Sequence, residues 1–491
     1  MQQKYTYSVL IRLLAIALSS LGALFLLPLV LNALGEYEFG IWGMVSSITG
    51  YLLLLDFGIA LACTRYLSLQ YDNRYQWPKI ISNALLLAFI VSLFLILAAV
   101  GIYAAIQTEL IPEQYHLLSN IIIITVVEVA ISIPLRMYMS VLRTEVRYLD
   151  IGLFEIVRVC VRIGGIALGL YLGAGLMSIV LIGSVANLLL FILSFVSVLK
   201  RHRTSYFSSL AFSKTIFYDL LSFSKSTAVS QSAEFFKFRT DSVLVAMLIG
   251  ITASAHYTII VFIVIMLTQV LMRFLSYWDT IIISKVGENQ HQQAISKLFK
   301  SLETGIAISS ISLVNIIILG DTFILYWVGE KYTFLHPSLI LLSLILLGIT
   351  FQMATTPYFN ALGKQQLNAH IDFGEIVLKL LLIIPMSAVF GLNGFIYSNL
   401  ISALIFSIGL RLYHLSKTCQ FSENFIYHHA LKLLFKYLMI TALLVIFYQF
   451  ALLTALTQRQ VQSLMLLIQL ALAGLFVIKF RYFNASKTCI A

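Results

Sequence analysis

Three charged residues stand inside one long apolar stretch: Glu155, Arg158 and Arg162. Their spacing of i, i+3 and i+7 places them on one face of a helix. A charge near the centre of a membrane span costs about 2.5–3.5 kcal/mol, so this face is expected to line a wet cavity or to pair with other charges. Because a guanidinium group matches phosphate oxygens and stays protonated, the spacing predicts an anion site. The alternative is an internal salt bridge, in which Glu155 neutralises Arg158 and Arg162 reaches toward the cytoplasm.

A second apolar stretch, expected to form a helix over residues 222–250, carries another set of polar residues. The members that share one stripe of this helix are Ser224, Gln231, Glu234 and Asp241, with Lys237 beside the stripe and Arg239 further round. A helix this polar cannot face lipid around its whole circumference, so we expect it to line a water-filled lumen. Arg273, deep in the next expected span, is a further lumen candidate. The residues assigned to an anionic substrate are Arg158, Arg162, Lys237, Arg239 and Arg273.

Carboxylates inside the apolar stretches form a second group of candidates. Asp56 and Glu128 each stand alone in their stretch, where a carboxylate either relays protons or cations or pairs with a structural arginine, and the residues alone leave both readings open. Arg12 and Arg65 lie near the ends of expected helices, where their side chains either reach the membrane surface or mark a substrate entrance. The predicted ion-coupling or charge-pairing set is Asp56, Glu128, Glu155, Glu234 and Asp241.

The elements that must position these residues are membrane-spanning helices. Of the 491 residues, 60% are hydrophobic and 11% are charged, and the mean hydropathy is +0.95. A soluble protein of this length could not bury so much apolar surface. A spanning helix needs about 20 apolar residues, and about fourteen runs satisfy this. The runs cover residues 9–34, 40–64, 80–106, 117–140, 151–172, 176–199, 222–250, 254–281, 302–320, 335–359, 372–390, 394–413, 430–454 and 461–482.

The formal net charge of +11 follows the membrane rather than nucleic acid. Most Lys and Arg residues fall in the two tails and the even-numbered loops, which predicts that both termini are cytoplasmic. The basic face also suits anionic lipid headgroups. The four cysteines are scattered, with no CxxC pair and no histidine at ligand spacing, so we expect neither a metal site nor a structural disulfide.

An internal repeat predicts the domain organisation. Leu153–Val157 is matched by Phe373–Val377, and Tyr138–Leu142 is matched at the same offset by Tyr358–Leu362. The offset covers six expected spans, so two parallel six-helix bundles are predicted, which is a common plan of transporters. The expected divisions are an N-terminal bundle at 1–200, a cytoplasmic linker at 201–221, a C-terminal bundle at 222–415, and two additional helices with a cytoplasmic tail at 416–491.

Short motifs in the first bundle point to a family. They are Leu34-Gly35-x4-Gly40-x-Trp42, Leu55-Asp56-Phe57-Gly58-Ile59 and Arg65-Tyr66. With these motifs and the repeat, the chain resembles the polysaccharide-exporter branch of the multidrug/oligosaccharidyl-lipid/polysaccharide (MOP) superfamily, and most of all the Wzx-type O-antigen and repeat-unit flippases. The resemblance implies an all-α, MATE/MOP-like membrane protein, with two parallel six-helix repeats around a central polar cavity and two C-terminal helices.

The resemblance also implies a function. A Wzx-type protein flips undecaprenyl-diphosphate-linked oligosaccharide repeat units across the bacterial inner membrane by alternating access, for cell-surface polysaccharide. The expected partners are this lipid-linked substrate, membrane lipids and polysaccharide polymerase or assembly proteins; no cofactor is expected beyond coupling to H⁺ or Na⁺. A MATE-like small-molecule or cation antiporter and a lipid II-type flippase are the alternatives. A membrane enzyme is not expected, because no large outer loop carries convergent catalytic groups.

Overall fold

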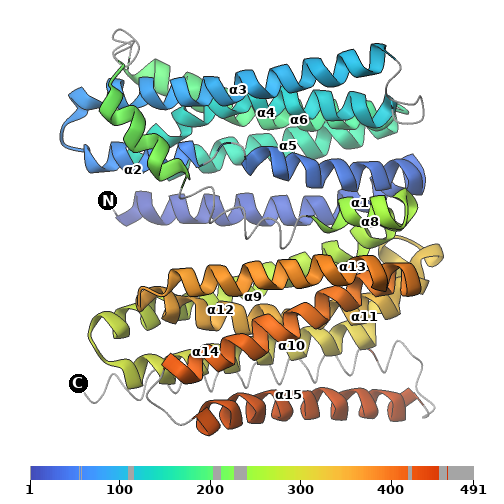
Figure 1. Ribbon diagram of the computed structural model, residues 1–491. Helices are drawn as coiled ribbons and strands as arrows, with labels where there is room; N and C mark the ends of the chain where they lie inside the picture. Colours follow the sequence, from blue (N-terminus) through green and yellow to red (C-terminus); the bar gives the residue numbers. More distant parts are fainter. Residues whose placement is uncertain are drawn as a thin grey trace. The chain divides into compact units, whose positions relative to one another are not determined.

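The computed structural model describes residues 2–54, 56, 58–108, 116–202, 212–225, 240–418, 423–452 and 462. These residues form helices joined by short turns, and no strand occurs among them (Figure 1). The chain divides into two compact units, Met1–Thr258 and Ile259–Ala491. The predicted all-α fold is therefore confirmed for the described residues. The boundaries predicted near residues 200 and 222 come from the sequence repeat, whereas these two units are defined by contacts in space. The predicted boundaries therefore stay a prediction.

The first unit is a helical bundle. Its helices are α1 (Gln2–Leu54), α2 (Ile59–Leu69), α3 (Trp77–Gln107), α4 (His116–Thr144), α5 (Tyr148–Tyr171), α6 (Leu176–His202) and α8 (Asp241–Leu248), with a 3-10 turn η1 at Arg74–Gln76 and the start of α9 (Ile251–Gly287). Within this unit α4 packs between α3 and α6, and α5 packs against α1 and α6. A mainly apolar cluster between α2, α3 and α4 holds this side of the bundle together.

The second unit contains the rest of α9 and the following helices: α10 (His291–Trp327), the 3-10 turn η3 (Glu330–Leu335), α11 (His336–Ser343), α12 (Ile345–Ala361), α13 (Gln365–Ser402), the π-helical segment η4 (Ala403–Leu410), α14 (Arg411–Thr418) and α15 (Glu423–Leu452). In this unit α10 contacts both α12 and α15. The predicted span at 461–482 lies outside the described residues, apart from Gln462.

Glycines with positive φ interrupt the long helices. Gly35, at φ +76°, divides the 53-residue α1, and Gly391, at φ +56°, divides α13. Gly250 also has positive φ and precedes α9. Because L side chains rarely adopt this conformation, glycine is the natural residue at these breaks.

One predicted span was wrong in its continuity. The run at 40–64 was expected to be a single helix, but α1 ends at Leu54 and α2 begins at Ile59. Gly58, at φ +68°, is left-handed and cannot continue a right-handed helix. Asp56 therefore lies in a turn between two helices, where its backbone carbonyl accepts a hydrogen bond from the Ile59 amide at 2.9 Å.

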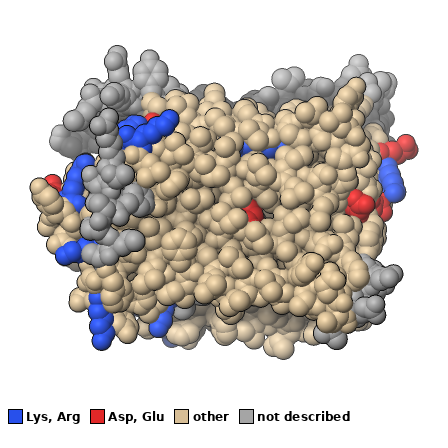
Figure 2. All heavy atoms as spheres, turned by 90° about the horizontal axis from the view of Figure 1, so that it is seen from above, with Lys and Arg blue, Asp and Glu red and all other residues tan. Residues whose placement is uncertain are grey.

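The exposed surface is apolar over the length of the helices. Nine helices of the described residues are long and apolar enough to cross a membrane. One of them, Ala17–Gly50, overlaps two predicted spans, and another, Gln365–Thr418, contains two predicted spans completely. Figure 2 shows a face that is mostly uncharged, with one acidic and one basic patch near its middle and Lys and Arg gathered mainly toward the end where α2 meets α3. Phe89, Leu93 and Phe94 of α3 are exposed. An exposed apolar surface of this size indicates lipid contact, so the chain is a multi-pass membrane protein; the expected count of fourteen spans is consistent with it.

We expect Gly394→Ala to destabilise the second unit by about 1–3 kcal/mol, because an overpacked position forces the backbone to shift. A Cβ atom at Gly394 would collide with the carbonyl oxygen of Met386 and come within 3.0 Å of the Ser387 nitrogen. These are backbone atoms, which cannot rotate away. Thermal unfolding of the purified protein measures the effect. The control is Gly101→Ala in α3, where a Cβ meets nothing within 4 Å, and this variant should unfold no earlier than the natural protein.

Candidate functional site

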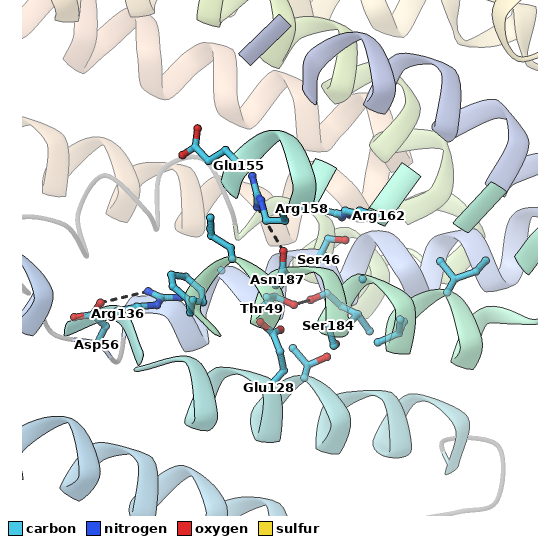
Figure 3. A pocket seen from close by; sticks show the side chains of 18 of the residues that line it. Ser46, Thr49, Asp56, Glu128, Arg136, Glu155, Arg158, Arg162, Ser184 and Asn187 are labelled. Carbon is cyan, nitrogen blue, oxygen red and sulfur yellow. Dashed lines mark hydrogen bonds and ion pairs between the residues drawn. The ribbon is translucent and has the colours of Figure 1, made fainter. Parts of the chain in front are cut away.

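A pocket of about 870 Å³ lies inside the first unit, between α1, α4, α5 and α6 (Figure 3). Seven charged side chains contribute to its lining: Asp56, Glu128, Arg136, Arg143, Glu155, Arg158 and Arg162. Hydroxyl and amide groups come from Ser46, Thr49, Thr125, Ser184 and Asn187, and two aromatic rings from Trp42 and Phe191. A polar cavity within a lipid-embedded bundle provides the wet surroundings that such charges require.

Helical spacing places these groups on the pocket. On α5, Glu155, Arg158 and Arg162 lie on the face that lines it, so the face predicted from the sequence is the one turned to the pocket. On α1, the segment after the break at Gly35 contributes Trp42 and Ser46 one turn apart. The Ser46 hydroxyl donates to the Trp42 carbonyl at 2.8 Å, which leaves its oxygen lone pairs free to accept from a ligand.

Arg158 has a neutral partner in the pocket. Its Nη1 donates to Oδ1 of Asn187 at 3.5 Å, which is a long hydrogen bond. Asn187 lies between Arg158 and Glu128 in Figure 3, and its amide also interacts with the Glu128 carboxylate. Glu128 is only 6% exposed. Asn187 therefore links a cation and a buried carboxylate from opposite sides of the pocket.

The other charges on α5 are not paired with each other. Within the described part of the chain no ion pair joins Glu155 to Arg158, and Figure 3 shows the Glu155 carboxylate pointing away from Arg158. The internal salt bridge considered from the sequence is therefore not formed among these residues. Arg162, one turn beyond Arg158, has no hydrogen-bond or ion-pair partner among the described residues. Two guanidinium groups thus face the pocket without a carboxylate bound to either.

The sequence reasoning missed Arg136 and Asn187 as pocket residues. Arg136 Nη1 contacts Oδ2 of Asp56 at 3.3 Å, across the space between α4 and the turn before α2. On its own helix Arg136 has Glu128 at i−8 and Arg143 at i+7, and both also line the pocket, so the periodicity of α4 was a local sign of this polar face. A search for opposite charges in different apolar runs could have proposed the pair, because a lone charge in a span is costly.

The remaining predicted site residues lie elsewhere. Asp241 is buried and accepts a 2.7 Å hydrogen bond from the Tyr257 hydroxyl, and it does not line this pocket. The Arg65 guanidinium lies 4.6 Å from the centre of the Phe223 ring, and Arg273 is exposed on α9 in the second unit. The predictions for Glu234, Lys237 and Arg239, and for the side chain of Arg12, fall outside what the structure describes. The roles assigned to all these residues stay predictions.

Comparison with solved structures defines the fold class. An inward-facing multidrug resistance MATE family transporter of the MOP superfamily superposes with a TM-score of 0.69 at 15% identity, covering 83% of this chain and 99% of that one. The lipid II flippase MurJ, in an inward closed conformation, superposes with a TM-score of 0.68 at 16% identity, covering 96% and 99%. The fold is thus that of the MOP-superfamily transporters, as the sequence resemblance implied.

The family follows from the sequence. The family described as "Polysaccharide biosynthesis protein" matches residues 6–277, which is more than half of the chain and includes the whole lining of the pocket. The chain belongs to this family. No curated protein matches it.

Proposed function

We propose that this protein flips undecaprenyl-diphosphate-linked oligosaccharide repeat units across the bacterial inner membrane, by alternating access, for the assembly of O-antigen, capsule or exopolysaccharide. The polysaccharide biosynthesis family and the MOP fold support the general class. The lipid tail stays in the bilayer, while the diphosphate and the sugars need a wet, polar route across the dry core.

The observation that carries this proposal is the state of the arginines in the pocket. Arg162 has no hydrogen-bond or ion-pair partner among the described residues and only a longer-range attraction to the Glu128 carboxylate, and Arg158 donates only to a neutral amide. Unpaired guanidinium groups in a partly buried cavity are costly unless an anion joins them, and a diphosphate offers oxygens in the matching geometry. The hydroxyl and amide groups of Thr49, Ser184 and Asn187 provide the hydrogen bonds that sugar hydroxyls require.

A lipid II-type flippase is the second candidate function. The MurJ structure covers 96% of this chain, whereas two MATE structures cover 83% and 84% of it. A lipid II-type substrate carries the same diphosphate, so the arginines serve it equally well and the saccharide distinguishes the two. A MATE-like antiporter of cationic drugs fits the pocket less well, since its arginines would repel such a substrate.

The test is a flipping assay in liposomes. The purified full-length protein is reconstituted with a fluorescent undecaprenyl-diphosphate oligosaccharide, and the fraction of label that an outside quencher reaches is followed over time. Access that grows only in protein-containing liposomes supports the proposal, and imposed H⁺ or Na⁺ gradients then show which ion drives it. Absence of transport for both an O-antigen-type and a lipid II-type substrate, together with gradient-driven efflux of a cationic dye, would overturn it.

A further inference from the structure

Arg136 is held differently from the other arginines of the pocket. We propose that the Asp56 carboxylate occupies the place of a substrate oxyanion on Arg136, and that Asp56 is displaced when the anionic group of the substrate, a phosphate or a sugar carboxylate, binds there. This inference rests on the proposed function, since it deepens the anion site of the same pocket. Arg136 then becomes a third anion-binding arginine beside Arg158 and Arg162, with Asp56 as its exchangeable partner.

The Arg136–Asp56 contact leaves most of the guanidinium unused. One contact joins the two side chains, from Nη1 to Oδ2 at 3.3 Å. The Arg136 Nε is buried and has no hydrogen-bond partner among the described residues, and the group lies 5.2 Å from the centre of the Phe191 ring. A strong arginine–carboxylate pair is bidentate, with two parallel hydrogen bonds near 2.8 Å. The observed pair is thus a weak one, with donors left for a second oxyanion.

A buried arginine of the second unit shows what a structural pair looks like in this chain. Arg411 is 0% exposed and donates to Asp372 at 2.6 Å, to Asn368 at 3.0 Å, and to Thr356 and Thr355 at 3.2 and 3.3 Å. Both of its terminal nitrogens have protein acceptors, whereas its Nε, like that of Arg136, has no partner among the described residues, so the two arginines differ at the terminal nitrogens. Arg136 instead lines an open pocket with one long contact. The two arginines therefore differ in whether a ligand has room and donors to bind.

Asp56 keeps a favourable position when it loses Arg136. The amide of Ala60, in the first turn of the 11-residue α2, donates to Oδ1 of Asp56 at 3.4 Å. The positive end of the helix dipole lies at the same place and stabilises a carboxylate. The Ser140 hydroxyl of α4 donates to the Ala60 carbonyl at 2.8 Å, which holds α2 against α4. The exchange therefore needs only side-chain rotation, with both backbones in place.

A resident carboxylate has two consequences for transport. It neutralises Arg136 while the pocket is empty, when a bare cation in a membrane bundle would be costly. It also competes with the substrate, so that binding is weaker than the arginines alone would allow and release is easier. A group with several negative charges, such as a diphosphate, displaces Asp56 more readily than a singly charged anion does.

The test is a double-mutant cycle on binding affinity. Full-length protein in lipid nanodiscs is titrated with two probes, farnesyl diphosphate and an alkyl β-glucuronide, to separate a phosphate from a sugar carboxylate. For the probe that occupies the site, Asp56→Asn should tighten binding about tenfold and Arg136→Gln should weaken it about tenfold. In the Arg136→Gln background, Asp56→Asn should have no further effect, because the competition needs the arginine. Asn keeps the size and the acceptor that bonds the Ala60 amide, and Asp56→Ser is a second uncharged replacement.

The control is Glu288→Gln, which removes an exposed carboxylate that Lys285 contacts at 2.7 Å outside the pocket; affinity for both probes should stay unchanged. Tighter binding of farnesyl diphosphate in Asp56→Asn assigns Arg136 to the diphosphate, and tighter binding of the glucuronide assigns it to an acidic sugar. Equal or weaker binding of both probes in Asp56→Asn and Asp56→Ser, with the natural protein binding normally, overturns the exchange but leaves the proposed function standing. If the natural protein and all variants bind neither probe, then the exchange, the anion site and the proposed function are all overturned.

Discussion

Replacing both Arg158 and Arg162 by alanine is expected to slow flipping of the lipid-linked oligosaccharide about 100-fold or more. Each hydrogen bond to a charged group contributes about 1.5–3 kcal/mol, and every 1.4 kcal/mol changes an affinity tenfold. Among the described residues neither arginine forms an ion pair with a carboxylate, so their removal takes binding energy mainly from the substrate, while Glu128 loses only a longer-range attraction to Arg162. The liposome assay measures the loss as the initial rate of label exposure.

Two matched variants separate a lost anion site from a damaged protein. Arg201→Ala removes an arginine that contacts Asp150 at 3.2 Å outside the pocket, and it should flip at the normal rate. Replacing Arg158 and Arg162 together by lysine keeps the charge but loses the planar fork, so an intermediate rate is expected. If the double alanine variant elutes and unfolds like the natural protein and still flips at the natural rate, the pocket arginines do not bind the substrate.

The substitution Arg411→Ala is expected to lower the free energy of unfolding by about 3–5 kcal/mol, the usual effect of breaking a buried ion pair. The variant leaves the acceptors of Asp372 and Asn368 facing an empty space in the second unit. The arginine joins α12, α13 and α14 through its hydrogen bonds, so the loss should act on all three. Thermal unfolding in detergent or nanodiscs measures the shift.

Lys436→Ala supplies the comparison for this prediction. Lys436 contacts Glu303 at 3.4 Å with both side chains partly exposed to solvent, and such a pair contributes at most about 1 kcal/mol. A small shift for Lys436→Ala and a large one for Arg411→Ala is the expected result. Equal, small shifts for both variants would show that the Arg411 network is not needed for the stability of the second unit. Any Arg411→Ala protein that does fold should keep its affinity for substrate, since Arg411 does not line the pocket.

Much of the fold could be predicted because lipid imposes a simple rule. Each span must satisfy its own backbone, so long apolar runs become helices and their positions can be counted from composition. The runs expected at 80–106, 117–140 and 176–199 lie within α3, α4 and α6. The break within 40–64 was missed. Gly58 ends the helix because its backbone is left-handed, and the presence of a glycine in an apolar run does not by itself reveal its backbone conformation.

Sequence alone determined which face of α5 would be turned to the pocket. Helical periodicity is a local property, and it places Glu155, Arg158 and Arg162 together without reference to the rest of the chain. Only the tertiary structure decided the partners of the charges. Arg136 meets Asp56, Arg158 meets Asn187, and Arg411 meets Asp372, each across different helices far apart along the chain. These pairings depend on how the helices pack and rotate, and apolar runs of similar composition do not encode this. An arginine that can bind a ligand is therefore distinguished from a structural arginine only when the helices are packed together.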